Sequence, residues 1–285
     1  MMKYILMLLV CFSFFSCKEK EVDFSKLQDR NGIYYEINSD SGYSGTATSY
    51  YENGQLNVVE NYKEGRLDGL SRWYYQNGQL IFEGNYKNGE KEGVGKEYYE
   101  NGQLRLDANY KNGKREGIQK DYYENGQLRL EGNYKNDIRE GNSKDYFENG
   151  QLMFDGNYRN GEKEGVFKEY YENGQLKAVG NYKNGKREGN SKDYFKNGQL
   201  MFDGNYRNGE KEGVFKEYYE NGQLRLDANY KNGDYDGLIK EYYENGQLEA
   251  EVNFNNGELE GYYIVYYDNG VVKEKGNIVD GVNVD

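Results

Sequence analysis

The feature that most constrains this chain is an Asn-Gly pair that recurs every 24 residues, from Asn53 to Asn269, without a single insertion. A fixed period of this kind indicates a repeat architecture, in which each unit packs mainly against its neighbours. The pair stands within the string Tyr-Tyr-Glu-Asn-Gly-Gln-Leu or a close variant of it. The glycines predicted to form these turns are Gly54, Gly78, Gly102, Gly126, Gly150, Gly174, Gly198, Gly222, Gly246 and Gly270.

A second turn recurs in the same register, 11 residues after the first. Most copies are again Asn-Gly, and the departures are Glu64-Gly65, Asn136-Asp137 and Asp280-Gly281. Asn-Gly between strand-forming residues is a strong hairpin signal, because a type I′ turn needs positive φ at both central positions. We therefore predict an all-β fold: an elongated, twisted antiparallel β-meander, a solenoid-like single sheet of about 20 strands.

The register of each hairpin follows if Asn101-Gly102 is a two-residue loop, because Tyr99 then pairs with Leu104. Alternation at period two gives one apolar face and one mostly polar face. The apolar face is predicted to carry Tyr99, Leu104, Leu106, Ala108 and Tyr110, and the polar face Lys96, Tyr98, Gln103, Arg105, Asp107 and Asn109. A small residue recurs on the apolar face, and we expect a neighbouring ring to lie over it. These residues are Gly84, Ala108, Gly132, Gly156, Gly180, Gly204 and Ala228.

The composition supports a folded β array and argues against several classes of protein. Aromatic residues make up 16% of the chain, whereas disordered chains are poor in aromatics. Tyrosine and phenylalanine bury large areas and can build a core with few aliphatic residues. The net charge of −12 disfavours a surface for nucleic acid or for anionic lipid.

Catalytic and metal-binding chemistry is not indicated by this sequence. The chain contains no histidine, which excludes Ser-His-Asp triads, Cys-His pairs and histidine-ligated metal sites. Carboxylates such as Glu92 and Glu97 recur in many units, so we interpret them as solvated charges that pair across strands rather than as a singular acid–base site. We expect a protein that is not an enzyme, with no catalytic residues, no metal and no cofactor.

Residues 1–17 have the pattern of a targeting segment. Lys3 precedes an apolar run of about a dozen residues, too short to span a bilayer comfortably and suited to a secretion signal. The run ends in Ser16-Cys17, which resembles the lipobox of bacterial lipoproteins, although Phe14 stands where leucine is usual. The resemblance implies that Cys17 is lipidated and anchors the chain to a membrane of the bacterial cell envelope, on its periplasmic or outer surface. An ordinary cleaved signal peptide is the alternative.

The repeat unit resembles the MORN-type repeat family, and in particular its bacterial variant, some members of which carry an antitoxin label. The string that carries the resemblance stands at Tyr98–Gly117 and comparably in the other units. The resemblance covers roughly residues 43–281 and implies an elongated, curled antiparallel sheet used for protein contacts. The expected organisation is a signal peptide at 1–17, a tether and degenerate strands at 18–42, about ten units at 43–281 and a C-terminal end at 282–285.

These observations lead us to expect a non-catalytic, lipid-anchored repeat protein that presents its sheet to a protein partner. A tyrosine column is a possible binding face, and it also suits a purely structural ladder. The column comprises Tyr74, Tyr98, Tyr122, Tyr146, Tyr170, Tyr194, Tyr218 and Tyr242. The alternatives are a glycan- or cell-wall-binding module, suggested by the string that begins at Trp73, an antitoxin-like neutraliser and a structural spacer.

Overall fold

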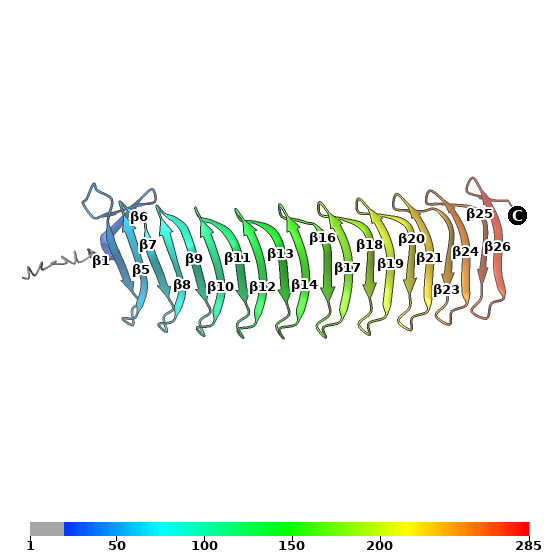
Figure 1. The fold of residues 1–285 in the computed structure, drawn as a ribbon, viewed down its shortest axis with the longest axis horizontal. Coiled ribbons are helices and arrows are strands. Elements are labelled where there is room, and N and C mark those ends of the chain that lie inside the picture. Colours follow the sequence, from blue (N-terminus) through cyan, green and yellow to red (C-terminus); the bar gives the residue numbers. More distant parts are fainter. Residues whose placement is uncertain (1–19, 285) are drawn as a thin grey trace, which may run out of the picture.

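The structure is a single long sheet of hairpins laid side by side (Figure 1). It is a computed structural model that describes residues 20–284, so the predicted signal peptide with Cys17 lies outside the described residues. A 25-stranded sheet and a small two-stranded sheet account for nearly all regular structure, together with one short 3₁₀ helix, η1 (Phe24–Lys26). The predicted elongated all-β meander is confirmed.

The bounds of the strands show two elements per repeat, some of them interrupted. The strands are β1 (Glu21–Asp23), β2 (Leu27–Arg30), β3 (Ile33–Glu36), β4 (Gly45–Tyr50), β5 (Leu56–Lys63), β6 (Arg66–Leu67), β7 (Gly69–Tyr74), β8 (Leu80–Lys87), β9 (Glu90–Tyr98), β10 (Leu104–Lys111), β11 (Lys114–Tyr122), β12 (Leu128–Lys135), β13 (Ile138–Tyr146), β14 (Leu152–Arg159), β15 (Glu162–Lys163), β16 (Gly165–Tyr170), β17 (Leu176–Lys183), β18 (Lys186–Tyr194), β19 (Leu200–Arg207), β20 (Glu210–Tyr218), β21 (Leu224–Lys231), β22 (Asp234–Tyr235), β23 (Gly237–Tyr242), β24 (Leu248–Asn255), β25 (Glu258–Tyr266), β26 (Val272–Val279) and β27 (Val282–Asn283). From β4 onward, antiparallel pairing links neighbours in the chain, and β1 adds to β4 in parallel at the first edge.

The second turn of each repeat is the predicted type I′ turn. In the hairpin between β10 and β11, Asn112 has φ 49° and Gly113 has φ 75°, and Lys111 pairs with Lys114 across the turn. The departures from Asn-Gly adopt the same backbone, since Glu64, Asp137 and Asp280 all have positive φ. Asparagine and glycine tolerate this region best, which explains why they dominate at these positions.

The first turn is not the predicted two-residue loop. Its Gly102 N–H donates to the carbonyl of Tyr99 at 2.8 Å, and only Gly102 has positive φ, which is a type I turn followed by a left-handed glycine and a bulge. Tyr98, not Tyr99, therefore pairs with Leu104, and Arg105 becomes the extra residue of the bulge. The predicted pairing was wrong by one residue at this turn. Beyond the bulge the predicted faces hold, because Lys96 pairs with Asp107 and Leu106 with Glu97.

A side-chain bond explains which turn forms. The Oδ1 atom of Asn101 accepts a hydrogen bond from the Gln103 N–H at 2.9 Å, and its Nδ2 atom donates to the Glu124 carbonyl of the next repeat at 3.0 Å. The opposite row of turns is joined in the same way, since the Asn112 N–H donates to Glu92 Oε2 at 2.9 Å. The two bonds between repeats span 23 and 20 residues. Such bonds require a constant repeat length, because an inserted residue would move the partner away.

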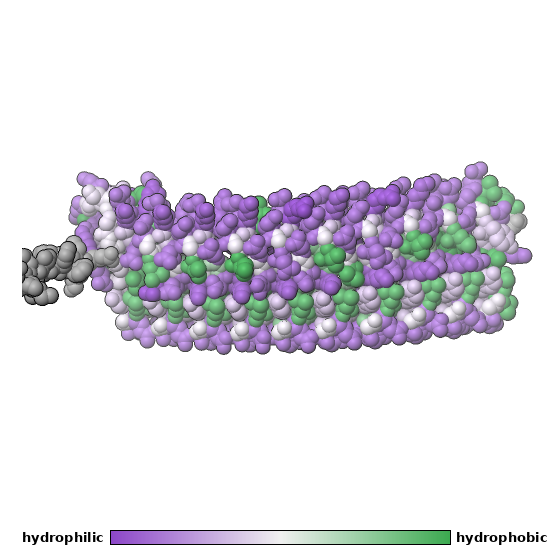
Figure 2. Space-filling view, viewed as in Figure 1, coloured by the Kyte–Doolittle hydropathy of each residue, from purple (hydrophilic) through white to green (hydrophobic). Residues whose placement is uncertain are grey.

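The two faces of the sheet differ strongly in burial. We call the face that carries Gly84, Ala108 and their equivalents the inner face, because Phe215 (0% exposed) and Ala108 (1%) lie on it. The outer face leaves Val94 (51% exposed) and Ile118 (58%) in solvent. Figure 2 shows one face of the array, on which apolar clusters recur along the long axis between rows of hydrophilic residues. A single layer can bury residues on one face when its strands curve around them, as they do in Figure 1.

The small residues of the inner face leave room for rings, as predicted. A Cβ atom added to Gly156 would lie 2.2 Å from the ring of Phe167, and one added to Gly204 would lie 2.4 Å from Phe215. A second bulge, at Gly117 and its equivalents, has positive φ in every repeat. Bulges increase local twist and bend strands. Two bulges per repeat, together with small residues on one side, account for the curl of the sheet.

The stretch that we expected to be a tether is folded where the structure describes it. Strand β1 joins the sheet, and β2 and β3 form a hairpin beside the first repeat. The ring of Tyr34 lies 5.0 Å from that of Tyr62, and Phe24 lies 5.6 Å from Tyr34. Apolar residues of this stretch thus pack at the first end of the inner face, and strands form within the region expected to hold a tether and degenerate strands, 18–42.

Candidate functional site on the inner face

A row of carboxylates runs along the inner face, one in each of seven successive repeats. Cross-strand pairing places Asp145 opposite Phe154, and Asp193 opposite Phe202, so acids and apolar residues alternate along the sheet. We call these acids the carboxylate row. It consists of Glu97, Asp121, Asp145, Glu169, Asp193, Glu217 and Glu241.

Most members of the carboxylate row hold a cation that stands eight residues later in the chain. Asp121 accepts hydrogen bonds from Arg129 at 2.9 Å and from Gln119 at 2.8 Å. Lys177 lies 3.6 Å from Glu169. Two further pairs of this kind join Glu97 to Arg105 and Glu217 to Arg225. In each pair, the nearby cation compensates the charge of a carboxylate that is partly buried.

Asp145 and Asp193 lack this partner, because Met153 and Met201 occupy the position of the cation. The Oδ1 atom of each aspartate is buried without a hydrogen-bond partner. Burial raises the pKa of the Asp193 carboxyl above its ordinary value, although the nearby charges of Arg187 and Lys177 act in the opposite direction. The pKa of Asp145 is raised for the same reason. Unpaired polar atoms of this kind are rare and costly in folded proteins.

A second row, of cations, lies between the tyrosine rings of the same face. Lys211 Nζ lies 4.4 Å from the centre of the Tyr230 ring and donates to its hydroxyl at 3.1 Å. Arg187 lies over Tyr206 at 5.1 Å and donates to the hydroxyls of Tyr182 and Tyr206. Cation–π contacts and hydrogen bonds therefore hold these groups on the aromatic surface.

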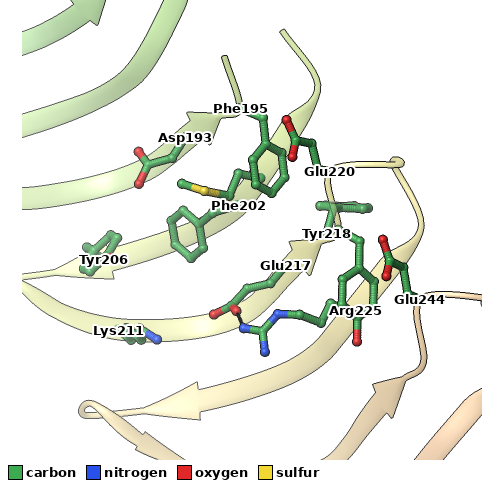
Figure 3. A pocket seen from close by; sticks show the side chains of 12 residues that line it. Asp193, Phe195, Phe202, Tyr206, Lys211, Glu217, Tyr218, Glu220, Arg225 and Glu244 are labelled. Carbon is green, nitrogen blue, oxygen red and sulfur yellow. Dashed lines mark hydrogen bonds and ion pairs between the residues drawn. The ribbon is translucent and has the colours of Figure 1, made fainter. Parts of the chain in front are cut away.

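Two equivalent pockets open around the unpartnered aspartates. The Asp193 pocket has a volume of about 580 Å³, and the Asp145 pocket about 380 Å³. Figure 3 shows the Asp193 pocket, with Phe195 and Phe202 close together on one side and the ion pair of Glu217 and Arg225 on the other. The lining residues shared by the pockets, 48 residues apart, are Asp145/Asp193, Phe147/Phe195, Met153/Met201, Phe154/Phe202, Tyr158/Tyr206, Lys163/Lys211, Glu169/Glu217, Tyr170/Tyr218 and Lys177/Arg225.

The pockets also mark a change in the turn tyrosines. In other repeats the second tyrosine of the string donates from its hydroxyl to the next repeat, as Tyr99 does to the Tyr122 carbonyl at 2.7 Å. Phe147 and Phe195 stand at this position in the two pocket repeats and have no hydroxyl to donate. The same repeats therefore replace a hydroxyl and a cation by apolar groups, and both changes enlarge the apolar part of the pocket wall.

The residues predicted from the sequence lie partly within this site. Tyr170 and Tyr218, two members of the tyrosine column, line the two pockets. The tyrosine column stands beside the first-turn bulge, where Tyr98 pairs with Leu104. The predicted turn glycines have φ between 79° and 87°. The predicted lipidation site, Cys17, lies outside the described residues. Sequence reasoning missed the unpartnered aspartates, although Met153 and Met201 alternate with Arg129, Lys177 and Arg225 at the same repeat position.

The carboxylates that we weighed for acid–base chemistry have structural partners. Glu92 accepts a backbone hydrogen bond from Asn112, and Glu97 pairs with Arg105. Residues 20–284 contain no group of three or more Asp, Glu, His or Cys placed to hold a metal ion. In the same part of the chain, no helix is long and apolar enough to cross a membrane.

Comparisons with known proteins identify the repeat. The family described as MORN repeat variant matches ten segments, at residues 43–64, 67–88, 91–112, 115–136, 139–160, 163–184, 187–208, 211–232, 235–256 and 259–280. No curated protein matches the chain. Among solved structures, TcdB2-TccC3 is similar at 12% identity and a TM-score of 0.21, over 84% of this chain and 15% of that one. Choline binding protein F from Streptococcus pneumoniae is similar at 15% identity and a TM-score of 0.18, over 91% and 96% of the two chains. These TM-scores are too low to support an argument, whereas the ten matched segments show that the chain belongs to the MORN repeat variant family.

Proposed function

We propose that this protein is a lipid-anchored repeat protein of a bacterial cell envelope that presents its inner face to a protein partner. The observation that carries the proposal is the pair of equivalent pockets at Asp145 and Asp193. They lie on a face where aromatic, cationic and anionic side chains alternate and where no second layer covers the described repeats. Surfaces that combine aromatic anchors with a few polar groups suit protein recognition.

The function is proposed to be non-catalytic. Members of the carboxylate row recur along the array, and most are engaged in ion pairs, which suits recognition better than a singular acid–base centre. Trp73 was the basis of the glycan alternative. Its ring lies 4.8 Å from that of Phe82 and its Nε1 donates to Glu60 at 2.9 Å, so no observation favours glycan over protein.

The anchor is tested by palmitate labelling of cells that express the full chain. We expect label on the wild type and on Cys11→Ala, and none on Cys17→Ala, because the lipobox resemblance assigns the lipid to Cys17. Protease shaving of intact cells then reports whether the array faces outward. A wild-type protein that is soluble and unlabelled would contradict the anchor.

Partner binding is tested by photo-crosslinking from the two faces. Benzoylphenylalanine placed at Phe195 lies in the pocket wall, whereas the same group at Val214 lies on the outer face, where the side chain is 52% exposed. We expect a discrete crosslinked protein from position 195 and none from position 214. Crosslinks only from position 214, or none from either position, would count against display of the inner face.

A further inference from the structure

The carboxylate row shows what the two pockets lack. Four members of the row, Glu97, Asp121, Glu169 and Glu217, each hold a lysine or arginine from their own chain. The cation reaches the acid from eight residues along the chain, across the first turn. Asp145 and Asp193 occupy the same place in the fold, and at the equivalent position each is followed by methionine.

The other cations near Asp193 are already engaged. Arg187 donates to two tyrosine hydroxyls and stacks on Tyr206, and Lys211 donates to Tyr230. Lys177 is paired with Glu169. The Asp193 Oδ1 atom is buried without a hydrogen-bond partner, and Asp193 lines the wall of the pocket. A cation from another molecule would complete this site in the way that Arg129 completes Asp121.

The pocket walls suit a cation on an apolar stem. Phe195, Met201 and Phe202 line the pocket beside Asp193, and Figure 3 shows the rings of Phe195 and Phe202 near the carboxylate. The methylene groups of lysine or arginine pack well on such surfaces, and aromatic faces attract the charged end. The lining of this pocket is net negative, because the four acids Asp193, Glu217, Glu220 and Glu244 outnumber the two cations Lys211 and Arg225.

The spacing of the pockets sets the spacing of the ligand. Asp145 lies on β13 and Asp193 on β18, four strand steps apart along the sheet. At about 4.8 Å per step this separation is roughly 19 Å. An extended peptide advances about 3.3 Å per residue, so two side chains that are six residues apart span it. Six is an even number, so both side chains point to the same side of an extended segment.

We propose that the Asp145 and Asp193 pockets are paired sites for two lysine or arginine side chains, about six residues apart, on an extended basic segment of the protein partner. This inference rests on the proposed function, and it specifies which side chains of the protein partner bind the inner face. The net charge of −12 attracts a basic segment to the array. Each cation takes the place that Arg129 fills beside Asp121 in another repeat.

The test uses capped synthetic peptides with the full mature chain. The first is Arg-Gly-Ser-Gly-Ser-Gly-Arg, and the second has the same composition with its two arginines adjacent. We expect the spaced peptide to bind at least about tenfold more tightly, because only it reaches both pockets. Equal affinity of the two peptides would overturn the proposal, and so would spermine competing as strongly as the spaced peptide.

Variants of the pockets separate site binding from general attraction. Asp145→Asn/Asp193→Asn removes both charges, and Met153→Arg/Met201→Arg supplies the cation present in other repeats, so both variants should abolish the preference for the spaced peptide. The matched control is Asp155→Asn/Asp203→Asn, which makes the same charge change on the outer face, where Asp203 pairs with Lys192 at 3.1 Å. This control should retain the preference. Retention of the preference in Asp145→Asn/Asp193→Asn would contradict the assignment.

The outcomes distinguish this proposal from the broader one. If the benzoylphenylalanine variant at position 195 captures a discrete partner and that capture survives Asp145→Asn/Asp193→Asn, display of the inner face stands and the cation sites are wrong. If both the capture and the peptide preference fail, the proposed function fails with them. Loss of capture in the pocket variant, with the outer-face control unchanged, supports both.

Discussion

Neighbouring side chains give chemically equivalent carboxylates of this array different roles. Asp121 and Asp193 occupy the same position in their repeats, yet Asp121 accepts hydrogen bonds from Arg129 and Gln119, whereas one oxygen of Asp193 has no partner. Removing a paired charge costs stability, and removing an unpaired buried charge relieves a desolvation penalty. Residues that are unfavourable for folding and lie in an open pocket are often retained for binding.

Matched substitutions at these two residues should have opposite effects on stability. Asp193→Asn is expected to raise the free energy of unfolding at pH 7, by up to about 1 kcal/mol, because it removes an unpaired buried charge. Asp121→Asn is expected to lower it by about 0.5–1 kcal/mol, because it weakens the pair with Arg129. Urea unfolding of the two variants and the wild type measures both. A loss of stability in both variants would contradict the assignment of Asp193 as unpaired.

The stability gain of Asp193→Asn should depend on pH. Because burial raises the pKa of Asp193 in the folded state above the ordinary 3.8, its favourable, protonated form is fully present below that value. The stability that the protonated carboxyl group contributes to the folded state is lost as pH rises through the raised folded-state pKa. The advantage of Asn over Asp is therefore expected at pH 7 and should vanish near pH 3. An advantage of equal size at both pH values would show that it does not come from ionisation.

At the scale of the element, packing between neighbouring strands decides which small residues the inner face needs. Phe215 on β20 lies between Gly204 on β19 and Ala228 on β21, and its ring leans over the glycine. A Cβ atom added to Gly132 on β12 would lie 3.2 Å from the Ser143 hydroxyl, its nearest neighbour, and 3.4 Å from the Tyr134 ring. An added methyl group therefore has less room at Gly204, beside a ring, than at Gly132, beside a serine.

Alanine substitutions in this column should separate the two cases. Gly204→Ala is expected to lower the free energy of unfolding by about 1–3 kcal/mol, because the added methyl group overlaps the Phe215 ring. Gly132→Ala is expected to change it by less than about 0.5 kcal/mol, as alanine already stands at position 108 of the same column. Thermal unfolding measures the difference. Equal effects of the two substitutions would mean that the ring does not lie over Gly204.

Elements were largely predictable from the sequence because both rows of turns repeat at fixed spacing. The error at the first turn has a physical cause: Asn-Gly suits both a type I′ loop and a type I turn followed by a left-handed glycine. The choice depends on the bond from Asn101 to the Glu124 carbonyl in the next repeat, which no isolated hairpin shows. The pockets were missed because Asp145 differs from Asp121 through residues outside the turn string, with Met153 in place of Arg129 and Ser143 in place of Gln119.

Across residues 20–284, the strand pairing and the hydrogen bonds between turns join each repeat to the next. The hydrogen bonds between turns span one repeat, and the sheet order follows the chain from β4 to β27. Stability is then a sum over repeats and their interfaces, so whole repeats can be removed. The identity of residues 149–176 and 197–224 shows that this array has itself changed by units of 48 residues.

Excision in register should preserve the fold and remove one pocket. Deleting residues 149–196 joins Glu148 to Asn197, and this junction reproduces the original neighbours. We expect an unchanged β-type circular dichroism spectrum and equal affinity for the spaced and adjacent peptides, because a single pocket remains. Deleting residues 149–159 joins Glu148 to Asn160, which places a second turn where a first turn belongs, and should lower the melting temperature sharply. Similar behaviour of the two deletions would contradict the linear array.

The most direct test of a cation site on the inner face is the carboxyl carbon resonance of Asp193, followed by NMR in protein with selectively labelled aspartate. In the free protein, the pKa of Asp193 should lie above 3.8, because the carboxyl group is buried and unpaired. Adding the spaced diarginine peptide should lower this pKa, because a cation then stabilises the charged form. A pKa at or below 3.8 in the free protein, or one that the peptide leaves unchanged, would contradict the account.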